Sequence, residues 1–305
     1  MDFRRDGAGR VFVARSAALV DLARVADSAA KTDSAVLISG ELGVGKKLFA
    51  QRLHYKSPRQ GNSFVRLNCA LLDSPLGEDQ FVDSVRDAGN GTLFLEEAGD
   101  IPLGLQAKLL EALQSKKISR SSSGEEFALG SRLVCATSKD LELMAKEGKF
   151  LEALLRRLGV VSLRIPPLRE RREDIKPLAD FFLRKFSAET KKAFKAFSPD
   201  AEKALCEYYW PGNVLELENA VERACVLGTP PFVGAQSLCL EGSAQVGGFV
   251  PQEGLSLKDA MAGFKKYYVG RALQTTGGRQ ADVAKVLGIQ RTYLSRLLTE
   301  LGIRQ

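Results

Sequence analysis

The chain has 305 residues, of which 45% are hydrophobic and 27% are charged, and its formal net charge is +7. This length predicts about two domains, and the composition is typical of a soluble protein with a sizeable core. No apolar run approaches the roughly 18 residues of a membrane span, and residues 1–12 lack a signal-peptide segment, which predicts a cytoplasmic protein without membrane contact. Five scattered cysteines without a CxxC pair and the single His54 exclude a disulfide framework and histidine-based sites.

The first half of the chain alternates between strand-like and helix-like segments. The predicted helices are residues 15–29, 46–54 and 103–114, and the predicted strands are residues 36–39, 64–67, 92–95 and 132–136. Strands that alternate with helices predict an α/β fold with a parallel sheet covered on both sides. We therefore expect an α/β domain over residues 1–165.

The pattern becomes purely helical after Pro166 and Pro167. Helical periodicity covers residues 174–188, 198–208 and 213–227, which predicts a small helical domain over residues 166–228. Residues 229–254 are rich in Gly, Pro, Ser and Gln and are predicted to be a linker. Residues 255–305 form the last predicted domain, which is all-helical.

A glycine-rich loop follows the strand predicted at residues 36–39. The sequence VLISGELGVGK places Gly40, Gly43, Gly45 and Lys46 in the spacing of a phosphate-binding loop. Backbone N–H groups of such a loop and of the helix behind it hold phosphates. Lys47 follows in place of Ser or Thr, so no hydroxyl is available for magnesium. The alternative is a glycine-rich turn on a core strand, without a ligand.

A second apolar strand ends in two acids. Leu93–Leu95 is followed by Glu96 and Glu97, and an acid at this place in a nucleotide-binding protein directs the metal ion or the attacking water. The pair strengthens the case for a nucleotide site over a simple turn.

Several segments resemble, in the same order, one family over roughly residues 10–230. They are Gly40–Lys46, Leu67-Asn68-Cys69-Ala70, Gly91–Glu97, Leu105–Leu113, PPLRERREDI at 166–175 and WPGNVLELEN at 210–219. The resemblance is to the AAA+ domain of sigma-54-dependent bacterial enhancer-binding transcription activators. It implies a P-loop sheet with a helical lid subdomain, and a ring of subunits with ATP between neighbours.

The resemblance also assigns roles to individual residues. The nucleotide-binding residues would be Gly40, Glu41, Gly43, Val44, Gly45, Lys46 and Lys47. Glu97 would polarise the attacking water, and Asn68 would switch Glu97 between two states. Arg157 would reach the γ-phosphate of the neighbouring subunit, a contact that can change the rate by about 10³–10⁵. Glu96 would direct Mg²⁺, and ATP or ADP would be the bound nucleotide.

The sequence departs from this family at several catalytic positions. Glu96 replaces an Asp and is one methylene longer, which weakens the placement of Mg²⁺ because this ion demands near-octahedral geometry. Leu151 stands at the first arginine-finger position, and Leu215 stands at the lid arginine position. Ser138 replaces a sensor Asn. Together these changes predict nucleotide binding with slow or absent hydrolysis.

The loop that contacts sigma-54 in this family is also expected to be missing. Only 22 residues separate Asn68 from Gly91, and they contain no GAFTGA motif. We therefore expect the usual coupling to sigma-54 RNA polymerase to be lost. The polymerase or a sigma factor remains a candidate partner in another form of contact.

The last segment is basic and has features of a helix-turn-helix. Residues 255–305 contain nine Lys or Arg against three acids, which is typical of a nucleic-acid-binding domain. A helix at 281–287, a Gly288-Ile289 turn and a helix at 291–301 resemble the Fis-type DNA-binding domain. The predicted base contacts are Gln290, Arg291, Thr292 and Ser295, and the predicted phosphate contacts are Arg279, Lys285 and Arg296. A solvated helical face or a hairpin that docks on the lid are the alternatives.

Three hypotheses follow from the sequence. The first is a bacterial DNA-binding transcription regulator that binds ATP, with degenerate catalytic motifs, acting as a homo-oligomer (a dimer or a ring) or in mixed rings with a related activator. The second is an ATP-hydrolysing activator whose substitutions are compensated. The third is a DNA-binding scaffold that no longer binds nucleotide, against which the retention of Lys46 and Glu97 argues.

Overall fold

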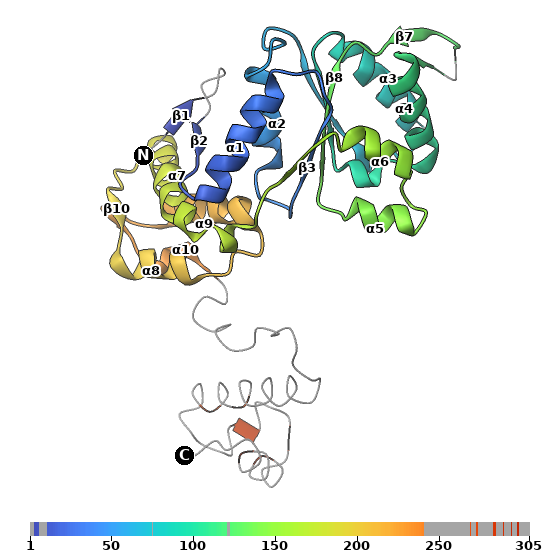
Figure 1. The fold of residues 1–305 in the computed structure, drawn as a ribbon. Helices are drawn as coiled ribbons and strands as arrows, with labels where there is room; N and C mark the ends of the chain where they lie inside the picture. The colour runs from blue at the N-terminus through green and yellow to red at the C-terminus, as the bar shows by residue number, and fades with distance from the viewer. Residues whose placement is uncertain are drawn as a thin grey trace. The chain divides into compact units, whose positions relative to one another are not determined.

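The computed structural model describes residues 3–5, 11–74, 76–120 and 123–240, together with positions 269, 273, 283, 284, 289, 294 and 298. The chain divides into two compact units, residues 1–239 and residues 240–305 (Figure 1). The first unit contains a strand-and-helix part followed by a lid.

The first unit is built on a five-stranded parallel sheet with the order β4-β5-β8-β3-β9. Its strands are β3 (Val36–Ser39), β4 (Phe64–Asn68), β5 (Thr92–Glu96), β8 (Arg132–Thr137) and β9 (Val161–Arg164). Every residue of β8 is buried, as expected for a parallel strand covered on both faces. The predicted parallel sheet is confirmed. The edge strand β9 was not predicted, because Leu163 is its only buried residue and four residues give no clear pattern.

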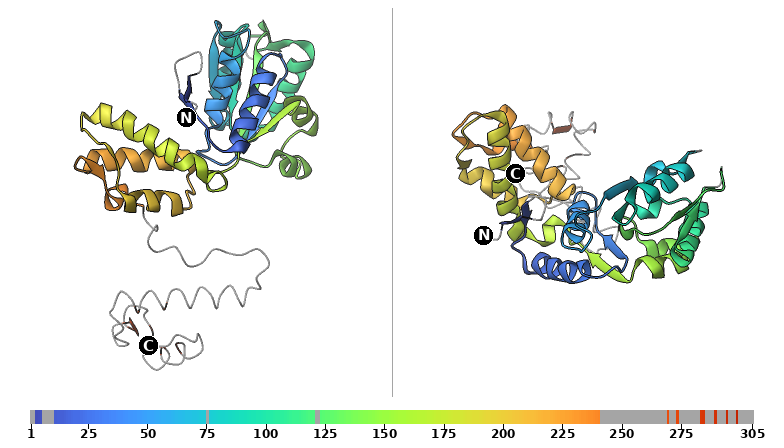
Figure 2. Two further views of the ribbon diagram at one scale, coloured as in Figure 1. Left: turned by 60° about the vertical axis from the view of Figure 1, so that its left-hand side comes forward. Right: turned by 90° about the horizontal axis from the view of Figure 1, so that it is seen from above.

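Helices cover both faces of this sheet, as Figures 1 and 2 show. One face carries α1 (Ala17–Ala30) and α2 (Lys46–Tyr55), and the other carries α3 (Gly77–Ala88), α4 (Leu103–Ser115), α5 (Leu141–Lys146) and α6 (Glu152–Leu158). The alternation of side chains along β5 separates the two cores, because Phe94 packs toward α1 and α2 while Leu93 and Leu95 pack toward the opposite face.

Shorter elements decorate the sheet. Two antiparallel hairpins pair β1 (Phe3–Arg5) with β2 (Val11–Val13) and β6 (Lys117–Ser119) with β7 (Glu126–Ala128). The 3₁₀ turns are η1 (Cys69–Leu71), η2 (Ala98–Asp100), η3 (Leu168–Glu170) and η4 (Arg172–Asp174). Cys69, Cys135 and Cys225 are buried, as expected of small hydrophobic residues, whereas Cys206 and Cys239 are exposed.

The lid contains α7 (Ile175–Thr190), α8 (Pro199–Glu207), α9 (Asn213–Leu227) and α10 (Ala235–Leu238). Two expectations for this region were wrong. The lid is not purely helical, because β10 (Ala196–Phe197) pairs in parallel with β11 (Phe232–Val233). The expected linker over 229–254 also begins too early, because β11 and α10 bury Val233 and Leu238 completely. A strand of two residues is too short to show the alternating pattern of a strand. The Gly and Pro residues around it are typical of a linker, so the composition predicted one.

The described positions of the second unit form a small apolar cluster. Val269, Val283, Ala284, Leu294 and Leu298 are buried against one another. The amide of Ile289 donates to the carbonyl oxygen of Ala284 at 3.0 Å, which closes the chain where the sequence predicts a turn. Elsewhere in residues 255–305, the predicted DNA contacts at 279, 285, 290, 291, 292, 295 and 296 lie outside the described residues.

The described ranges contain neither a candidate membrane span nor a candidate metal-binding cluster. No helix there is long and apolar enough to cross a membrane. No group of three or more His, Cys, Asp or Glu side chains in the same ranges is arranged to hold a metal ion.

Arg132 ties α1 to the sheet and generates a stability prediction. This side chain is 2% exposed, and its guanidinium donates to the carbonyl oxygens of Ala29 at 2.8 Å and Ala30 at 3.0 Å. We expect Arg132→Ala to lower the free energy of unfolding by about 3 kcal/mol, because the carbonyl oxygens of Ala29 and Ala30 lose a charged hydrogen-bond donor. Urea denaturation followed by circular dichroism measures this loss.

The matched control is Arg24→Ala. Arg24 is on α1 itself, its side chain is 74% exposed, and it pairs with Asp21 across one turn. We therefore expect the free energy of unfolding to change by less than about 0.5 kcal/mol. Equal effects of the two substitutions would contradict the anchoring role of Arg132.

Candidate nucleotide-binding site

The glycine-rich loop connects β3 to α2 and needs glycine for two reasons. Gly40, Gly43 and Gly45 have φ values of 151°, 77° and 104°, in the left-handed region that side chains disfavour. A Cβ atom on Gly43 would also lie 2.2 Å from the carbonyl oxygen of Gly212, and one on Gly40 would lie 2.8 Å from that of Ile165. The loop therefore follows a tight path between β3 and α2 that only glycine allows at these positions.

Lys46 begins α2 and is buried, with 8% of its surface exposed. Its ammonium donates to the carbonyl oxygens of Gly40 at 2.9 Å and Glu41 at 3.2 Å. It also lies 3.0 Å from Oε1 of Glu97. The predicted phosphate-binding lysine and the predicted water-polarising glutamate are thus brought together.

Glu97 follows β5 in a strained backbone conformation. Its φ is 54° and its ψ is 58°, a left-handed geometry that costs a residue with a side chain about 1–2 kcal/mol. Its Oε2 accepts hydrogen bonds from the backbone amide of Ser138 at 2.8 Å and from the Ser138 hydroxyl at 2.7 Å. Both carboxylate oxygens are therefore held, one by Lys46 and one by Ser138.

The side chain of Asn68 makes its hydrogen bond within its own turn. Its Oδ1 accepts the amide of Ala70 at 3.1 Å and caps η1, and within the described ranges no hydrogen bond joins Asn68 to Glu97. The proposed switch role of Asn68 therefore has no contact in this conformation. Ser138, which the sequence suggested only as a loss, instead holds the glutamate.

Glu96 pairs with an arginine that sequence reasoning missed. Arg66 lies on β4, whose parallel register places Asn68 opposite Glu96. Its Nε is 3.5 Å from Oε2 of Glu96. Neighbouring parallel strands bring their carboxyl ends together, so the Arg66–Glu96 pair could have been predicted if β4 and β5 had been known to be neighbours.

The start of α9 caps the glycine-rich loop from the lid side. The amides of Val214 and Leu215 donate to the carbonyl oxygen of Gly43 at 3.0 and 3.3 Å. Asn213 is fully buried, and its amide nitrogen donates to Oε2 of Glu41 at 3.0 Å and to the carbonyl oxygen of Leu42 at 2.9 Å. These contacts join the WPGN segment directly to the loop.

Two arginines of the PPLRERREDI segment complete this attachment. Arg169 donates to Glu41, with Nη1 2.8 Å from Oε2, and this hydrogen bond lowers the pKa of Glu41 to about 2. Arg171 is buried and donates to the carbonyl oxygen of Val44 at 2.8 Å, and its burial lowers its pKa from the usual value. Neither arginine had been assigned a role from the sequence.

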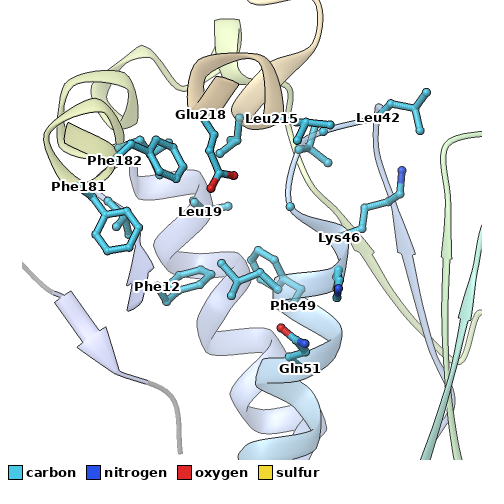
Figure 3. Close-up of a pocket in the computed structure, with 18 of the residues that line it drawn as sticks. Phe12, Leu19, Leu42, Lys46, Phe49, Gln51, Phe181, Phe182, Leu215 and Glu218 are labelled. Carbon is cyan, nitrogen blue, oxygen red and sulfur yellow. The ribbon is translucent and has the colours of Figure 1, made fainter. Parts of the chain in front are cut away.

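A cavity of about 830 Å³ opens between the loop and the lid (Figure 3). Phe12, Phe49, Phe181 and Phe182 make an apolar end. Lys46 lies on the other side of the cavity from Phe181 and Phe182, and Lys47, Arg66, Glu96 and Glu97 also line the cavity. This volume and this division suit a small molecule with an aromatic ring at one end and anionic groups at the other.

The lid side of the cavity contains Leu215 and an ion pair. Leu215 lines the cavity from α9, as Figure 3 shows, and is 56% exposed. Lys185 of α7 and Glu218 of α9 pair at 2.8 Å on the same side. Arg157, the predicted finger, is exposed on α6 and does not line this cavity.

The fold and the site together identify the class to which this protein belongs. A parallel sheet of this order, a glycine-rich loop followed by a lysine that begins a helix, an acidic pair at the end of β5, which β8 separates from the loop strand β3, and a helical lid together define an AAA+ nucleotide-binding fold. Comparison with known families agrees: the Sigma-54 interaction domain family matches residues 12–164, the AAA+ ATPase lid domain matches 169–246, and the Fis family of bacterial regulatory proteins matches 264–301. The chain belongs to the Sigma-54 interaction domain family, and its expected Fis-type helix-turn-helix domain is confirmed.

Individual relatives support this assignment. The chain is 36% identical to the regulatory protein AtoC of Escherichia coli K12, covering 94% of this chain and 67% of the relative. It is 39% identical to the transcriptional regulatory protein ZraR of Klebsiella oxytoca, covering 88% and 64%. The chain thus spans about two thirds of the length of these relatives.

Solved structures are similar as well. NtrX from Brucella abortus in complex with ATP superimposes with a TM-score of 0.74 at 31% identity, over 96% of this chain and 70% of that one. The RuvB branch migration motor of Thermotoga maritima, at 14% identity and a TM-score of 0.54, shares the fold alone.

The ion pair between Glu41 and Arg169 gives a prediction about the pH dependence of stability. Because Arg169 lowers the pKa of Glu41 from 4.5 to about 2, ionised Glu41 stabilises the folded state at neutral pH. This stabilisation is complete above the ordinary pKa and is lost as pH falls through the folded-state value. We expect Glu41→Gln to be less stable than the parent protein at pH 7, and the difference to shrink between pH 4.5 and about 2.

Urea denaturation of both proteins across this pH range measures the difference. Curves that stay equally far apart down to the acid end would contradict the pairing of Glu41 with Arg169.

Proposed function

We propose that this protein is a DNA-binding transcription regulator whose AAA+ domain binds ATP or ADP and hydrolyses ATP slowly or not at all. The observation that carries this proposal is the Lys46–Glu97 pair at 3.0 Å, set at the cationic end of the cavity beneath the glycine-rich loop. A phosphate that entered between these residues would meet the lysine and the amides at the start of α2.

Support for nucleotide binding comes from the whole cavity. Its phenylalanines offer an apolar surface for a base, and its loop offers backbone donors for phosphates. The similar NtrX structures were solved with ATP and with ADP. The predicted loop residues Gly40, Glu41, Gly43, Val44, Gly45, Lys46 and Lys47 would form the phosphate end of this site.

Support for weak hydrolysis comes from the positions at which charged groups would stabilise the transition state. Leu215 is an apolar residue that lines the cavity where an arginine is expected. Leu151, at a finger position, has no charge to offer a neighbouring subunit. Glu96 already pairs with Arg66, which weakens it further as a ligand for Mg²⁺. Hydrolysis needs these charges in the transition state, whereas binding needs mainly the loop.

The proposed loss of the usual sigma-54 contact rests on the segment between β4 and β5. It contains no GAFTGA motif, and η1 and α3 occupy most of it. A regulator of this kind would act on polymerase or a sigma factor through another surface, or would join mixed rings with a competent relative. Arg157, exposed on α6, is the group that would reach a neighbour in such a ring.

One observation favours the second candidate, an ATP-hydrolysing activator. Ser138 still reaches Glu97 with both its amide and its hydroxyl. A serine at the sensor position could therefore orient the glutamate as an asparagine would. Arg157 would then act as the single finger.

Lys46 and Glu97 separate these candidates in one experiment. We expect the purified protein to bind a fluorescent ATP analogue and to release little phosphate. Lys46→Ala should weaken binding by about tenfold or more, because a buried charge-assisted contact is lost. Glu97→Gln should keep the binding, since the loop is unchanged.

Lys149→Ala is the control, because Lys149 is exposed and pairs with Glu147 outside the cavity. Clear phosphate release that disappears in Glu97→Gln would favour the hydrolysing activator. Absence of binding in the parent protein would favour a DNA-binding scaffold.

A separate prediction concerns how the protein recognises DNA. It rests on the sequence and on the Fis-family match over 264–301. We expect Arg291→Ala to relax sequence preference by about 1–3 kcal/mol, because a bidentate arginine–guanine contact discriminates by this amount. Competition between a selected site and scrambled DNA, at fixed salt, measures the preference. A uniform loss of affinity for all DNA would instead identify Arg291 as a phosphate contact.

A further inference from the structure

Cationic side chains stand at positions where a nucleotide-bound metal ion would need ligands. In P-loop proteins Mg²⁺ is held by the hydroxyl after the loop lysine and by an acid at the end of another strand of the sheet. Here Lys47 occupies the hydroxyl position on the first turn of α2, and Arg66 reaches the strand-end acid Glu96. Both cations line the cavity.

This arrangement does not fit a divalent ion. A Mg²⁺ beside Glu96 would meet the positive charge of Arg66, and Lys46 and Lys47 line the same cavity. Glu96 would have to leave Arg66 to become a ligand, and Lys47 could not replace the missing hydroxyl, because an ammonium has no lone pair to offer. Within the described ranges no cluster of acids, histidines or cysteines offers an alternative site.

The position of Arg66 suits an anion. Its side chain is 49% exposed and faces the cavity from β4, while Glu96 contacts it at Nε from one side. In the part of the chain that the structure describes, neither terminal nitrogen of Arg66 donates a hydrogen bond. A guanidinium held at one edge by a carboxylate keeps its fork of donors for a phosphate.

The charges also balance. A polyphosphate normally brings a divalent ion that neutralises two of its negative charges. Lys47 and Arg66 together supply the same charge from the protein, in addition to Lys46. This charge is fixed in the protein, so it needs no ion from solution.

We propose that Lys47 and Arg66 are phosphate-contacting residues that replace Mg²⁺, so that the protein binds a nucleoside di- or triphosphate without a divalent ion. Glu96 acts as the positioning residue of Arg66 in this site. The proposal rests on the proposed nucleotide binding and adds to it which residues hold the phosphates and under which ionic conditions.

The test compares the affinity of the full chain for a fluorescent ATP analogue in Mg²⁺ and in excess EDTA. We expect the two dissociation constants to agree within about threefold. Arg66→Ala and Lys47→Ala should each weaken binding in EDTA by about tenfold, the usual effect of removing one charge-assisted contact. Circular dichroism melting of each variant verifies that it is folded.

Arg86→Ala is the matched control. Arg86 is 52% exposed and pairs with Asp83 at 3.2 Å on α3, outside the cavity, so its loss removes the same charge and a similar ion pair. We expect its affinity in EDTA to equal that of the parent protein.

The other outcomes are distinguishable. Binding that requires Mg²⁺ would overturn the inference and leave nucleotide binding standing. Binding in EDTA that survives both Arg66→Ala and Lys47→Ala would show that Arg66 and Glu96 are only a surface ion pair, and would also overturn it. Absence of binding in either buffer would overturn the proposed function itself.

Discussion

The carbonyl oxygen of Gly43 accepts hydrogen bonds from the first amides of α9, and this contact fixes the glycine-rich loop against the lid. The loop needs a partner here because its tight path turns the Gly43 carbonyl outward, and unpaired helix amides at the start of α9 need an acceptor. Asn213, Arg169 and Arg171 reinforce the contact from the same side. The shape of the cavity therefore depends on the lid as much as on the sheet.

Within the cavity, charge is distributed so that each carboxylate already has a cation. Glu97 pairs with Lys46, and Glu96 pairs with Arg66. The two pairs differ in surroundings, since Lys46 is buried whereas the side chain of Arg66 is half exposed. The first pair is therefore largely shielded from water, and the second remains in contact with it.

The local parts of this structure could be predicted from the sequence, and the long-range pairings could not. The glycine-rich loop, its lysine and the acidic strand end are contiguous patterns, so residue spacing alone was enough. The Ser138–Glu97 and Asn213–Glu41 contacts join residues 41 and 172 positions apart, and they depend on strand order and on how the lid packs. Helix α3 was not predicted, although Phe81, Val82 and Val85 lie on one buried face, because the segment between Asn68 and Gly91 was considered only for its missing GAFTGA motif.

Trp210 gives the lid an optical signal of its own. It is the only tryptophan of the chain, it is fully buried, and its indole N–H donates to the carbonyl oxygen of Leu205 at 2.9 Å. Asn213, which grips the loop, is three residues further on. Tryptophan emission from the unlabelled protein therefore comes from a single place, beside the attachment of the lid to the loop. A change of its wavelength would report loosening of that attachment separately from unfolding of the sheet.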